Sequence, residues 1–281
     1  GTLSAPAPEP GVVHADLKEF VLSHGGFRYA VFAIDEHSRH VFYDCIKLKS
    51  EADAAIKRIR AAFNATVGTP VDSEGRAMPR PRLLELHSDR EGKWISNAFS
   101  EYRGDASLHH TTSPPHDHDL NPIAERIIGL ISETATAIRL STEASPRLWP
   151  WLIAYAVDWH NATVSSVGSS TADANITPHQ RFTLRPPKVM DLPAFGCRAV
   201  VLKPPKHQHK PSLSGRGWVG HFLGRSRYSK GSYDVLVNGQ VVSSSSVTVD
   251  EERFDWAPPD KQHQPLTAAV HAARQAQPTA L

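Results

Sequence analysis

The sequence has few cysteines and no long apolar run, and each shortage excludes a class of protein. Its two cysteines, Cys45 and Cys197, lie far apart and outside any CxxC pair, which argues against a disulfide framework or a cysteine-rich zinc site. The most apolar stretch, LWPWLIAYAV, is followed by Asp158 and is too short for the roughly 20 residues that cross a bilayer. The opening GTLSAPAPEP lacks the apolar core of a signal peptide. We therefore expect a soluble, intracellular protein.

The sequence also lacks a strong charge of one sign. Its formal net charge is +2 over 281 residues, which is too small to indicate nucleic-acid binding by itself. With 40% hydrophobic and 21% charged residues, the composition is that of an ordinary globular protein. The length suits one large domain, or a core domain with a smaller module. Any inference about function must therefore come from where the charged residues lie in the sequence.

The first part of the chain alternates between strand-like and helix-like patterns. Three β-rich segments come first, then a helix with Ser50 as its expected N-cap, a strand, a short helix, a strand and two long helices. These elements are expected at 11–21, 27–39, 40–48, 50–68, 82–88, 96–105, 107–113, 121–140 and 147–162. This order predicts a mixed α/β layer architecture.

The second part of the chain is expected to be a small β module after a linker. Residues 163–190 are rich in Ser, Thr and Pro, and short β segments follow within 191–255. The Asn238-Gly239 pair in VNGQV is a strong hairpin signal. The residues after 256 are polar and carry Pro and Ala, which predicts a loose tail.

Three acidic residues stand at places where a carboxylate has a chemical use. Asp16 lies in the middle of an expected strand, where a charge is costly without a task or a partner. Asp89 ends another strand, and Glu125 lies in the first turn of a helix that Asn121 and Pro122 mark as its start. If they have no catalytic role, Asp16 would form a salt bridge, Asp89 would lie in a turn and Glu125 would be an exposed helix residue.

The helix of Glu125 is expected to direct that residue toward the strand ends. Ile128 and Gly129 lie one turn further on the same face, and this apolar face should pack on the sheet. Thirty-five residues separate Asp89 from Glu125. An Asp, Asp and Glu set with this spacing resembles the acidic triad of retroviral-type integrases and related transposases. Carboxylates suit Mg²⁺, and two such ions can promote phosphodiester chemistry.

Longer segments make the resemblance more specific. The sequence resembles the integrase of copia-type (Pseudoviridae) LTR retrotransposons over roughly residues 12–254. The matching segments are IDEHSRHVFYDCIKLKS, LHSDREG, TTSPPHDHDLNPIAER, TPHQRFTLRPPKVMDLPAFGC and GHFLGRSRYSKGSYDVLV. The resemblance implies an RNase H-like mixed five-stranded sheet flanked by helices, followed by a small all-β, SH3-like module. The predicted parts are a flexible lead-in (1–10), the catalytic core (11–165), a linker (166–190), the DNA-binding β module (191–256) and a disordered tail (257–281).

The resemblance implies a DDE-type polynucleotidyl transferase. Asp16, Asp89 and Glu125 would be its catalytic and metal-binding residues, holding two Mg²⁺ or Mn²⁺ ions. It would process the 3′ ends of element DNA and join them to target DNA. Its partners would be double-stranded DNA, both element ends and target, and further copies of the chain, with no membrane and no small-molecule cofactor. The expected location is the nucleus, after a cytoplasmic particle stage.

Basic residues beside the acids and in the second part are candidates for binding DNA. Lysines, arginines and aromatic residues alternate in the second part, and this combination suits phosphate contacts and base stacking. The same pattern is also typical of a solvated loop around an aromatic core. The candidates are Arg90, Lys93, Arg126, Lys203, Lys206, Lys210, Arg216, Arg225, Arg227 and Lys230, with Trp218, Phe222 and Tyr228 among the aromatic residues.

Other notable residues favour structural interpretations. We expect Asp35 to cap the turn near Ser38, His14 to be a packed histidine, and the tryptophans of the 147–162 helix to be core or interface residues. The histidines of the loop (His109, His110, His116 and His118) favour a solvated segment over a zinc site.

Two further functions stay open. The family usually has Asn-Gly-Gly-Glu-Phe after the second aspartate, whereas this chain has Arg90, Glu91, Gly92, Lys93 and Trp94. This departure favours a catalytically inactive DNA-binding or assembly protein derived from such an integrase. The third alternative is an RNase H-like nuclease, which shares the fold and the metal ions.

Overall fold

The computed structural model describes six stretches of the chain, namely residues 10–88, 108–112, 121–164, 175–187, 192–202 and 217–254. The chain divides into two compact units. The first unit comprises Gly1–Ala135 and Pro146–Met190, and the second comprises Thr136–Ser145 and Asp191–Leu281. Within the described residues, each unit contains one sheet.

The first unit is built on a mixed five-stranded sheet. Its strands are β1 (Val12–Glu19), β2 (Tyr29–Asp35), β3 (Val41–Ile46), β4 (Glu85–Ser88) and β5 (His109–Thr112), in the spatial order β3-β2-β1-β4-β5. The first three strands form an antiparallel meander, whereas β4 is parallel to β1 and β5 is parallel to β4. This is the strand arrangement of the RNase H-like fold, as the sequence predicts.

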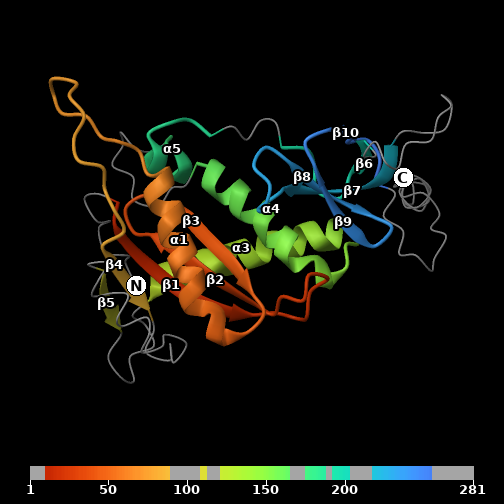
Figure 1. Cartoon of the computed structure of the whole chain (residues 1–281), viewed down its shortest axis with the longest axis horizontal. Helices are drawn as coiled ribbons and strands as arrows, with labels where there is room; N and C mark the ends of the chain where they lie inside the picture. The colour runs from red at the N-terminus through yellow and green to blue at the C-terminus, as the bar shows by residue number, and fades with distance from the viewer. Residues whose placement is uncertain are drawn as a thin grey trace, which may run out of the picture. The chain divides into compact units, whose positions relative to one another are not determined.

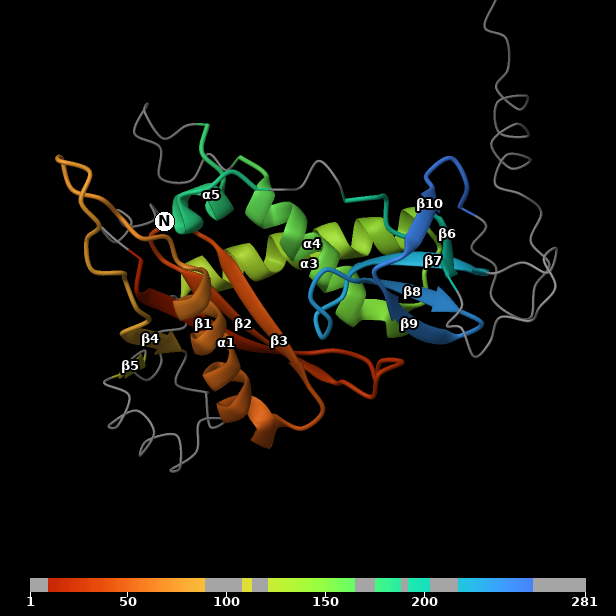
Figure 2. The ribbon, with the colours of Figure 1, turned by 45° about the horizontal axis from the view of Figure 1, so that its top comes forward.

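Helices cover both faces of this sheet. Helix α1 (Ala52–Thr66) lies on one face, and α3 (Pro122–Ser141) and α4 (Trp149–Ala162) lie on the other (Figures 1 and 2). The prediction of Ser50 as N-cap is wrong. Ser50 lies inside the short 3-10 helix η1 (Lys49–Glu51), and α1 follows it directly. A second 3-10 helix, η3 (Pro146–Leu148), precedes α4.

The core beneath α1 combines small strand residues with large aromatic rings. Phe63 of α1 is fully buried, and its ring centroid lies 4.8 Å from that of Phe182 and 5.7 Å from that of Phe42. Phe182 belongs to α5 (Pro178–Thr183), a short helix within the predicted linker, and Thr177 caps this helix by accepting from the Gln180 amide. Burying one such ring contributes about 1.5–3 kcal/mol. The segment containing α5 is therefore part of the core.

The second unit contains a second five-stranded sheet, which is entirely antiparallel. Its strands are β6 (Arg198–Leu202), β7 (Gly217–Arg225), β8 (Tyr233–Val237), β9 (Gln240–Ser244) and β10 (Val247–Asp250), in the order β10-β6-β7-β8-β9. This sheet confirms the expected all-β module.

The hairpin between β8 and β9 turns at the predicted dipeptide. Asn238 has φ of 48° and Gly239 has φ of 77°, so both central residues occupy the left-handed region that a two-residue hairpin of this type needs. The fully buried Phe222 lies in the core of the module. Among the described helices, none is long and apolar enough to span a membrane.

Candidate functional site

The two faces of β1 have different surroundings. Val13 and Ala15 are fully buried in the core cluster that contains α1. Side chains alternate along a strand, so His14, Asp16 and Lys18 point to the opposite face, where α3 lies. Asp16 is half-buried in the middle of β1, as predicted. The candidate acidic residue therefore faces the helix that carries Glu125.

His14 connects β1 to the start of α3. Its Nδ1 lies 3.0 Å from Asn121 Oδ1, and its Nε2 lies 3.1 Å from Glu36 Oε2. The Asn121 amide nitrogen donates to the Ala15 carbonyl at 3.2 Å, so the Asn121 oxygen must be the acceptor for His14. Thus Nδ1 carries the proton of the neutral ring, and the Nε2–Glu36 contact needs a second proton held by either partner.

A second link fixes α3 further along β1. Lys18 Nζ donates to Ser132 Oγ at 2.8 Å. Ser132 comes seven residues after Glu125, and seven residues at 100° each bring a side chain back to within about 20° of the same helix face. Glu125 therefore lies on the face of α3 that reaches β1 at Lys18. Asp16 lies between the two linked residues of β1, His14 and Lys18.

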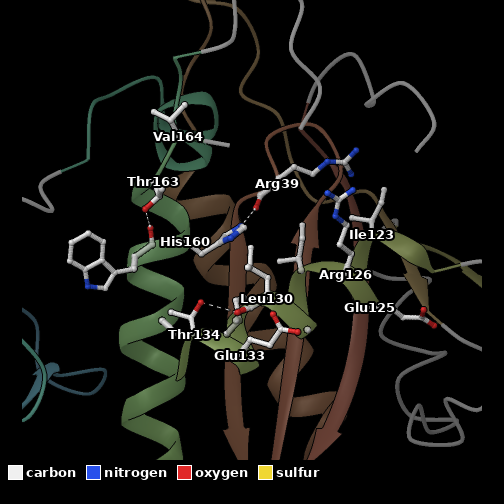
Figure 3. A pocket seen from close by; sticks show the side chains of 15 residues that line it. Arg39, Ile123, Glu125, Arg126, Leu130, Glu133, Thr134, His160, Thr163 and Val164 are labelled. Atoms are coloured by element: carbon white, nitrogen blue, oxygen red, sulfur yellow. Dashed lines mark hydrogen bonds between the residues drawn. The ribbon is translucent and has the colours of Figure 1, made fainter. Parts of the chain in front are cut away.

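The two candidate acids that the structure describes, Asp16 and Glu125, differ in exposure. The Asp16 carboxylate accepts from the Leu17 amide at 2.7 Å, and the Glu125 side chain is exposed. Glu125 is among the residues that line the cavity between α3 and α4, and Figure 3 shows its carboxylate pointing away from His160. Ile128, one turn further on, is buried as predicted, which orients this first turn of α3. Both acids offer oxygen donors of the kind that Mg²⁺ prefers.

The third predicted acid, Asp89, lies outside the described residues, as do Arg90 and Lys93. The described residues contain no group of three His, Cys, Asp or Glu that could hold a metal ion. The parallel register between β1 and β4 ends with Ala15 opposite Ser88. In the sequence, each of these two residues is followed by an aspartate: Asp16 follows Ala15, and Asp89 follows Ser88.

Asp35 has the structural role that the sequence predicts. Its carboxylate accepts from the Ser38 amide at 2.8 Å, from Ser38 Oγ at 2.6 Å and from the Gly11 amide at 3.1 Å. Burial raises the pKa of the Asp35 carboxyl, and these hydrogen bonds oppose that rise. The three donors hold the turn between β2 and β3, which also carries Glu36 and Arg39.

The end of α4 is bonded to the same turn. His160 Nε2 lies 3.1 Å from the Arg39 carbonyl oxygen, and the Asn161 amide bonds to both the N–H and the C=O of Val41, at 2.8 and 3.0 Å. His40 is buried against the Phe182 ring, and burial lowers its pKa to about 3. The neighbouring His179 and His160 act in the same direction.

A cavity of about 820 Å³ lies between α3 and α4. Its walls are largely apolar, and Leu130 and Trp159 at the cavity are partly exposed, at 52% and 42%. Its polar lining includes Arg39, Arg126 and Glu133 (Figure 3). Arg126, a predicted DNA contact, is exposed at the start of α3.

The remaining predicted sites divide between exposed and undescribed positions. Arg225, Arg227 and Lys230 are exposed in and after β7, and Tyr228 between them is 75% exposed. Phe222 is instead a core residue, and Trp218 is half-buried. The other predicted contacts of this part, Lys203, Lys206, Lys210 and Arg216, lie outside the described residues.

The histidine-rich segment is described only in part. The exposed His109 begins β5, and His110 Nε2 bonds to Ser88 Oγ at 2.9 Å. His116 and His118 lie outside the described residues. Trp149 is a core residue, as predicted, whose Nε1 donates to the Val21 carbonyl at 2.7 Å.

Sequence reasoning missed Glu36 and the surroundings of Arg39. Glu36 is hydrogen-bonded to His14 although the two residues are 22 positions apart in the sequence, and no local sequence pattern predicts such a contact. Arg39 has φ of 63°, unusual for a residue with a Cβ, and its side chain is buried. The segment IDEHSR is part of the family resemblance, but the spacing of its residues predicts neither the Glu36–His14 contact nor the burial of Arg39.

Comparison with known proteins gives distant relatives. The chain is 27% identical over 210 residues to the retrovirus-related Pol polyprotein from transposon RE1 of Arabidopsis thaliana, a match that covers 74% of this chain and 13% of that protein. For the polyprotein from transposon RE2 of the same plant, identity is 25% over 239 residues, covering 84% and 15%. The chain thus spans about one seventh of the length of these relatives. No protein-family model matches the chain.

Among solved structures, the chain is similar to the simian T-cell lymphotropic virus intasome in complex with PP2A regulatory subunit B56 gamma. The sequence identity is 16% and the TM-score is 0.49, over 89% of this chain and 81% of that chain. The sequence matches extend to the Pol polyprotein from transposon TNT 1-94 of Nicotiana tabacum, at 24% identity over 188 residues. The chain is thus homologous to the retrovirus-related Pol polyproteins of plant copia-type transposons.

Proposed function

We propose that the chain is the integrase part of such a polyprotein and joins element DNA to target DNA. The observation that carries the proposal is the connection of α3 to β1 on both sides of Asp16. The His14–Asn121 and Lys18–Ser132 hydrogen bonds hold the helix beside the strand. Glu125 lies between Asn121 and Ser132 along the helix, just as Asp16 lies between His14 and Lys18 along the strand. The homology to Pol polyproteins supports the same assignment.

Asp89 would complete the acidic site through its place in the chain. Asp89 directly follows Ser88 in the sequence, and Ser88 pairs with Ala15, the residue before Asp16. Asp16, Asp89 and Glu125 would then hold two Mg²⁺ or Mn²⁺ ions. When bound, these ions would neutralise charge on the reacting phosphate and lower the pKa of an attacking water or hydroxyl. Oxygen donors on three separate elements suit hard cations of this kind.

The chain's own residues would orient the acids and hold the DNA. The His14–Asn121 link would set the distance between Asp16 and the first turn of α3. Arg126, together with Arg90 and Lys93, would contact phosphates near the acids. The basic residues of the second unit, among them Arg225, would bind the DNA backbone without reading its sequence. We propose that the protein acts as an oligomer on chromosomal DNA in the nucleus.

A strand-transfer assay with Mg²⁺ or Mn²⁺ and a duplex carrying element ends tests the proposal. Glu125→Gln removes a metal ligand without changing shape, and we expect joined products to vanish. Glu133→Gln is the matched control, because Glu133 lies on the same helix outside the proposed acidic site. Equal activity of the Glu125→Gln variant and the parent protein would mean that the acidic site is wrongly assigned.

Two alternatives predict different results, one in the same assay and one with an RNA–DNA hybrid as the substrate. A protein that binds DNA but shows no cleavage or joining with either metal would be an inactive DNA-binding or assembly protein. The residues after Asp89 favour that alternative, since they depart from the family pattern. Cleavage of the RNA strand in an RNA–DNA hybrid, in place of joining, would identify an RNase H-like nuclease.

A further inference from the structure

Arg39 combines three features that each cost stability. Its side chain is buried, with 3% of the residue exposed, and its backbone occupies the left-handed region at φ 63°. Its Nη1 atom is buried and has no hydrogen-bond partner in the described structure. A buried charge without a partner is destabilising by several kcal/mol in general, and a left-handed non-glycine residue adds to that cost.

The carboxylates nearest to Arg39 are engaged with other groups. Glu36 Oε2 is hydrogen-bonded to His14 Nε2, and the Asp35 carboxylate accepts hydrogen bonds from Gly11 and Ser38. Both carboxylates attract the guanidinium from a distance, whereas Arg181 repels it. Burial lowers the pKa of Arg39 as well. The described surroundings thus leave a cationic group that lacks a close counter-ion.

A second arginine and a helix start lie at the same cavity. Arg126 and Arg39 both line it, and their side chains extend to the same end of it in Figure 3. Arg126 directly follows the first turn of α3, a helix of 20 residues, and the unpaired N–H groups of that turn and the helix dipole favour an anion there. The acidic Glu133 and the hydroxyl-bearing Thr134 line the cavity further along α3.

We propose that Arg39 and Arg126 form a subsite for one backbone phosphate of a DNA strand at the start of α3. The planar guanidinium group of arginine matches a phosphate with two parallel hydrogen bonds, which suits a buried or half-buried site. The phosphate supplies the missing counter-ion of Arg39 and approaches the positive end of α3. Only the choice of DNA as the source of the phosphate rests on the proposed function.

Because Arg126 follows Glu125 directly in the sequence, this subsite would place a bound DNA strand next to the proposed acidic site. Successive residues of a helix point about 100° apart, so the side chains of Glu125 and Arg126 diverge. Both residues line the cavity, and in Figure 3 Arg126 extends to the end that Arg39 reaches, whereas the Glu125 carboxylate points away from it. A phosphate held by the two arginines positions the strand, while the reacting phosphate lies beside Glu125. Arg39 is accordingly a substrate-positioning residue.

The test measures thermal unfolding of the full chain in sodium phosphate and in sodium chloride of equal ionic strength. For the parent protein we expect phosphate to raise the unfolding temperature above its value in chloride. For Arg39→Gln we expect that difference to disappear, while the unfolding temperature in chloride stays equal or rises because an unpaired buried charge is gone. Arg76→Gln, which removes an exposed arginine paired with Asp72, is the charge-matched control and should keep the full phosphate effect.

DNA binding at several salt concentrations identifies the source of the phosphate. In Arg126→Gln, which removes an exposed side chain and keeps the fold, the slope of log affinity against log salt should fall by about 0.9 for one lost phosphate contact. Arg39→Gln should show the same loss.

Three outcomes would overturn the proposal. The first is an Arg39→Gln variant that unfolds at a lower temperature in chloride and retains the phosphate effect, because Arg39 would then be a structural residue. The second is an unchanged salt slope in the Arg126→Gln variant. The third is Arg39-dependent binding of polyglutamate without Arg39-dependent binding of DNA, which would assign the subsite to an acidic protein. All of these measurements are independent of strand-transfer activity, so their failure is distinguishable from failure of the proposed function.

Discussion

The two five-stranded sheets place their candidate functional residues in different surroundings. On the first sheet, Asp16 is half-buried and its neighbour His14 is fixed by hydrogen bonds to Asn121 and Glu36. In the second unit, the described candidate cations (Arg225, Arg227 and Lys230) and Tyr228 are exposed in and after β7. Fixed side chains suit chemistry that needs defined distances, whereas exposed cations suit binding that tolerates many DNA sequences. The difference predicts large, localised effects of substitutions on the first sheet and small, distributed effects on the second.

The largest effect is expected at Asp16. The substitution Asp16→Asn keeps the shape of the side chain and removes its charge, so a metal ligand is lost while the fold remains. We expect joining activity to fall by at least about 100-fold, because metal-ion catalysis supplies several kcal/mol of transition-state stabilisation. Gel analysis of joined DNA products measures this loss, with circular dichroism as the check on folding. Activity within a few-fold of the parent protein would remove Asp16 from the site.

The next largest effect is expected at the link between β1 and α3. His14→Ala deletes both contacts of the ring, and loss of groups that orient metal ligands costs about 10- to 100-fold in activity. Misplaced acids should lower kcat more than they raise KM. His14→Gln offers one polar contact to Asn121 and should recover part of kcat. A purely structural histidine would instead lower the unfolding temperature and leave kcat of the folded fraction unchanged.

A third effect concerns acid stability and again distinguishes the first unit. The folded pKa of His40, about 3, lies below the ordinary value of 6.5, so the unfolded state binds more protons between these values. The stability present above pH 6.5 is therefore lost as pH falls toward 3, by about 2 kcal/mol between pH 7 and pH 5 for one such group. His40→Phe, packed against Phe182 and Phe42, should reduce this loss.

Denaturant unfolding at pH 7 and pH 5 measures the acid effect. His160 also has a pKa lowered by burial and keeps part of the acid sensitivity in the His40→Phe variant. An equal loss of stability in the parent protein and the variant would show that His40 is not the group that titrates.

The smallest effect is expected on the second sheet. Replacing Arg225 and Arg227 together by Gln should weaken DNA binding several-fold and reduce the salt slope by about 0.9 for each lost phosphate contact. Stability should change by less than about 0.5 kcal/mol, because both side chains are exposed. Arg253→Gln, an exposed arginine paired with Asp250 in the same unit, is the control. A change as large as that of Asp16→Asn would erase the contrast between the two sheets.

Much of the fold follows from local patterns in the sequence. The strands β1, β2 and β3 appear as separate β-rich runs, and Asn238-Gly239 marks its hairpin because both residues tolerate positive φ. Asp16 and Glu125 were predictable as site candidates, because a charge in mid-strand and an acid at a marked helix start are local features. Asp35 was predictable as a turn cap for the same reason.

The remaining features depend on contacts between distant parts of the chain. The Ser50 prediction failed because the 3-10 turn η1 takes up the residues where a cap would act. The His14–Asn121 contact joins residues 107 apart, and Phe182 joins the core from a segment that its composition marks as a linker. Such contacts are set by the packing of the whole sheet, and no short sequence pattern encodes them.

The most direct test of the account is a structure of the chain with bound Mn²⁺. We expect at least one ion to touch both Asp16 and Glu125, with Asp89 as a further ligand, at oxygen–metal distances close to those of Mg²⁺, about 2.0–2.1 Å. Carboxylates of Asp16 and Glu125 that stay too far apart to share an ion, or an ion held elsewhere, would contradict it.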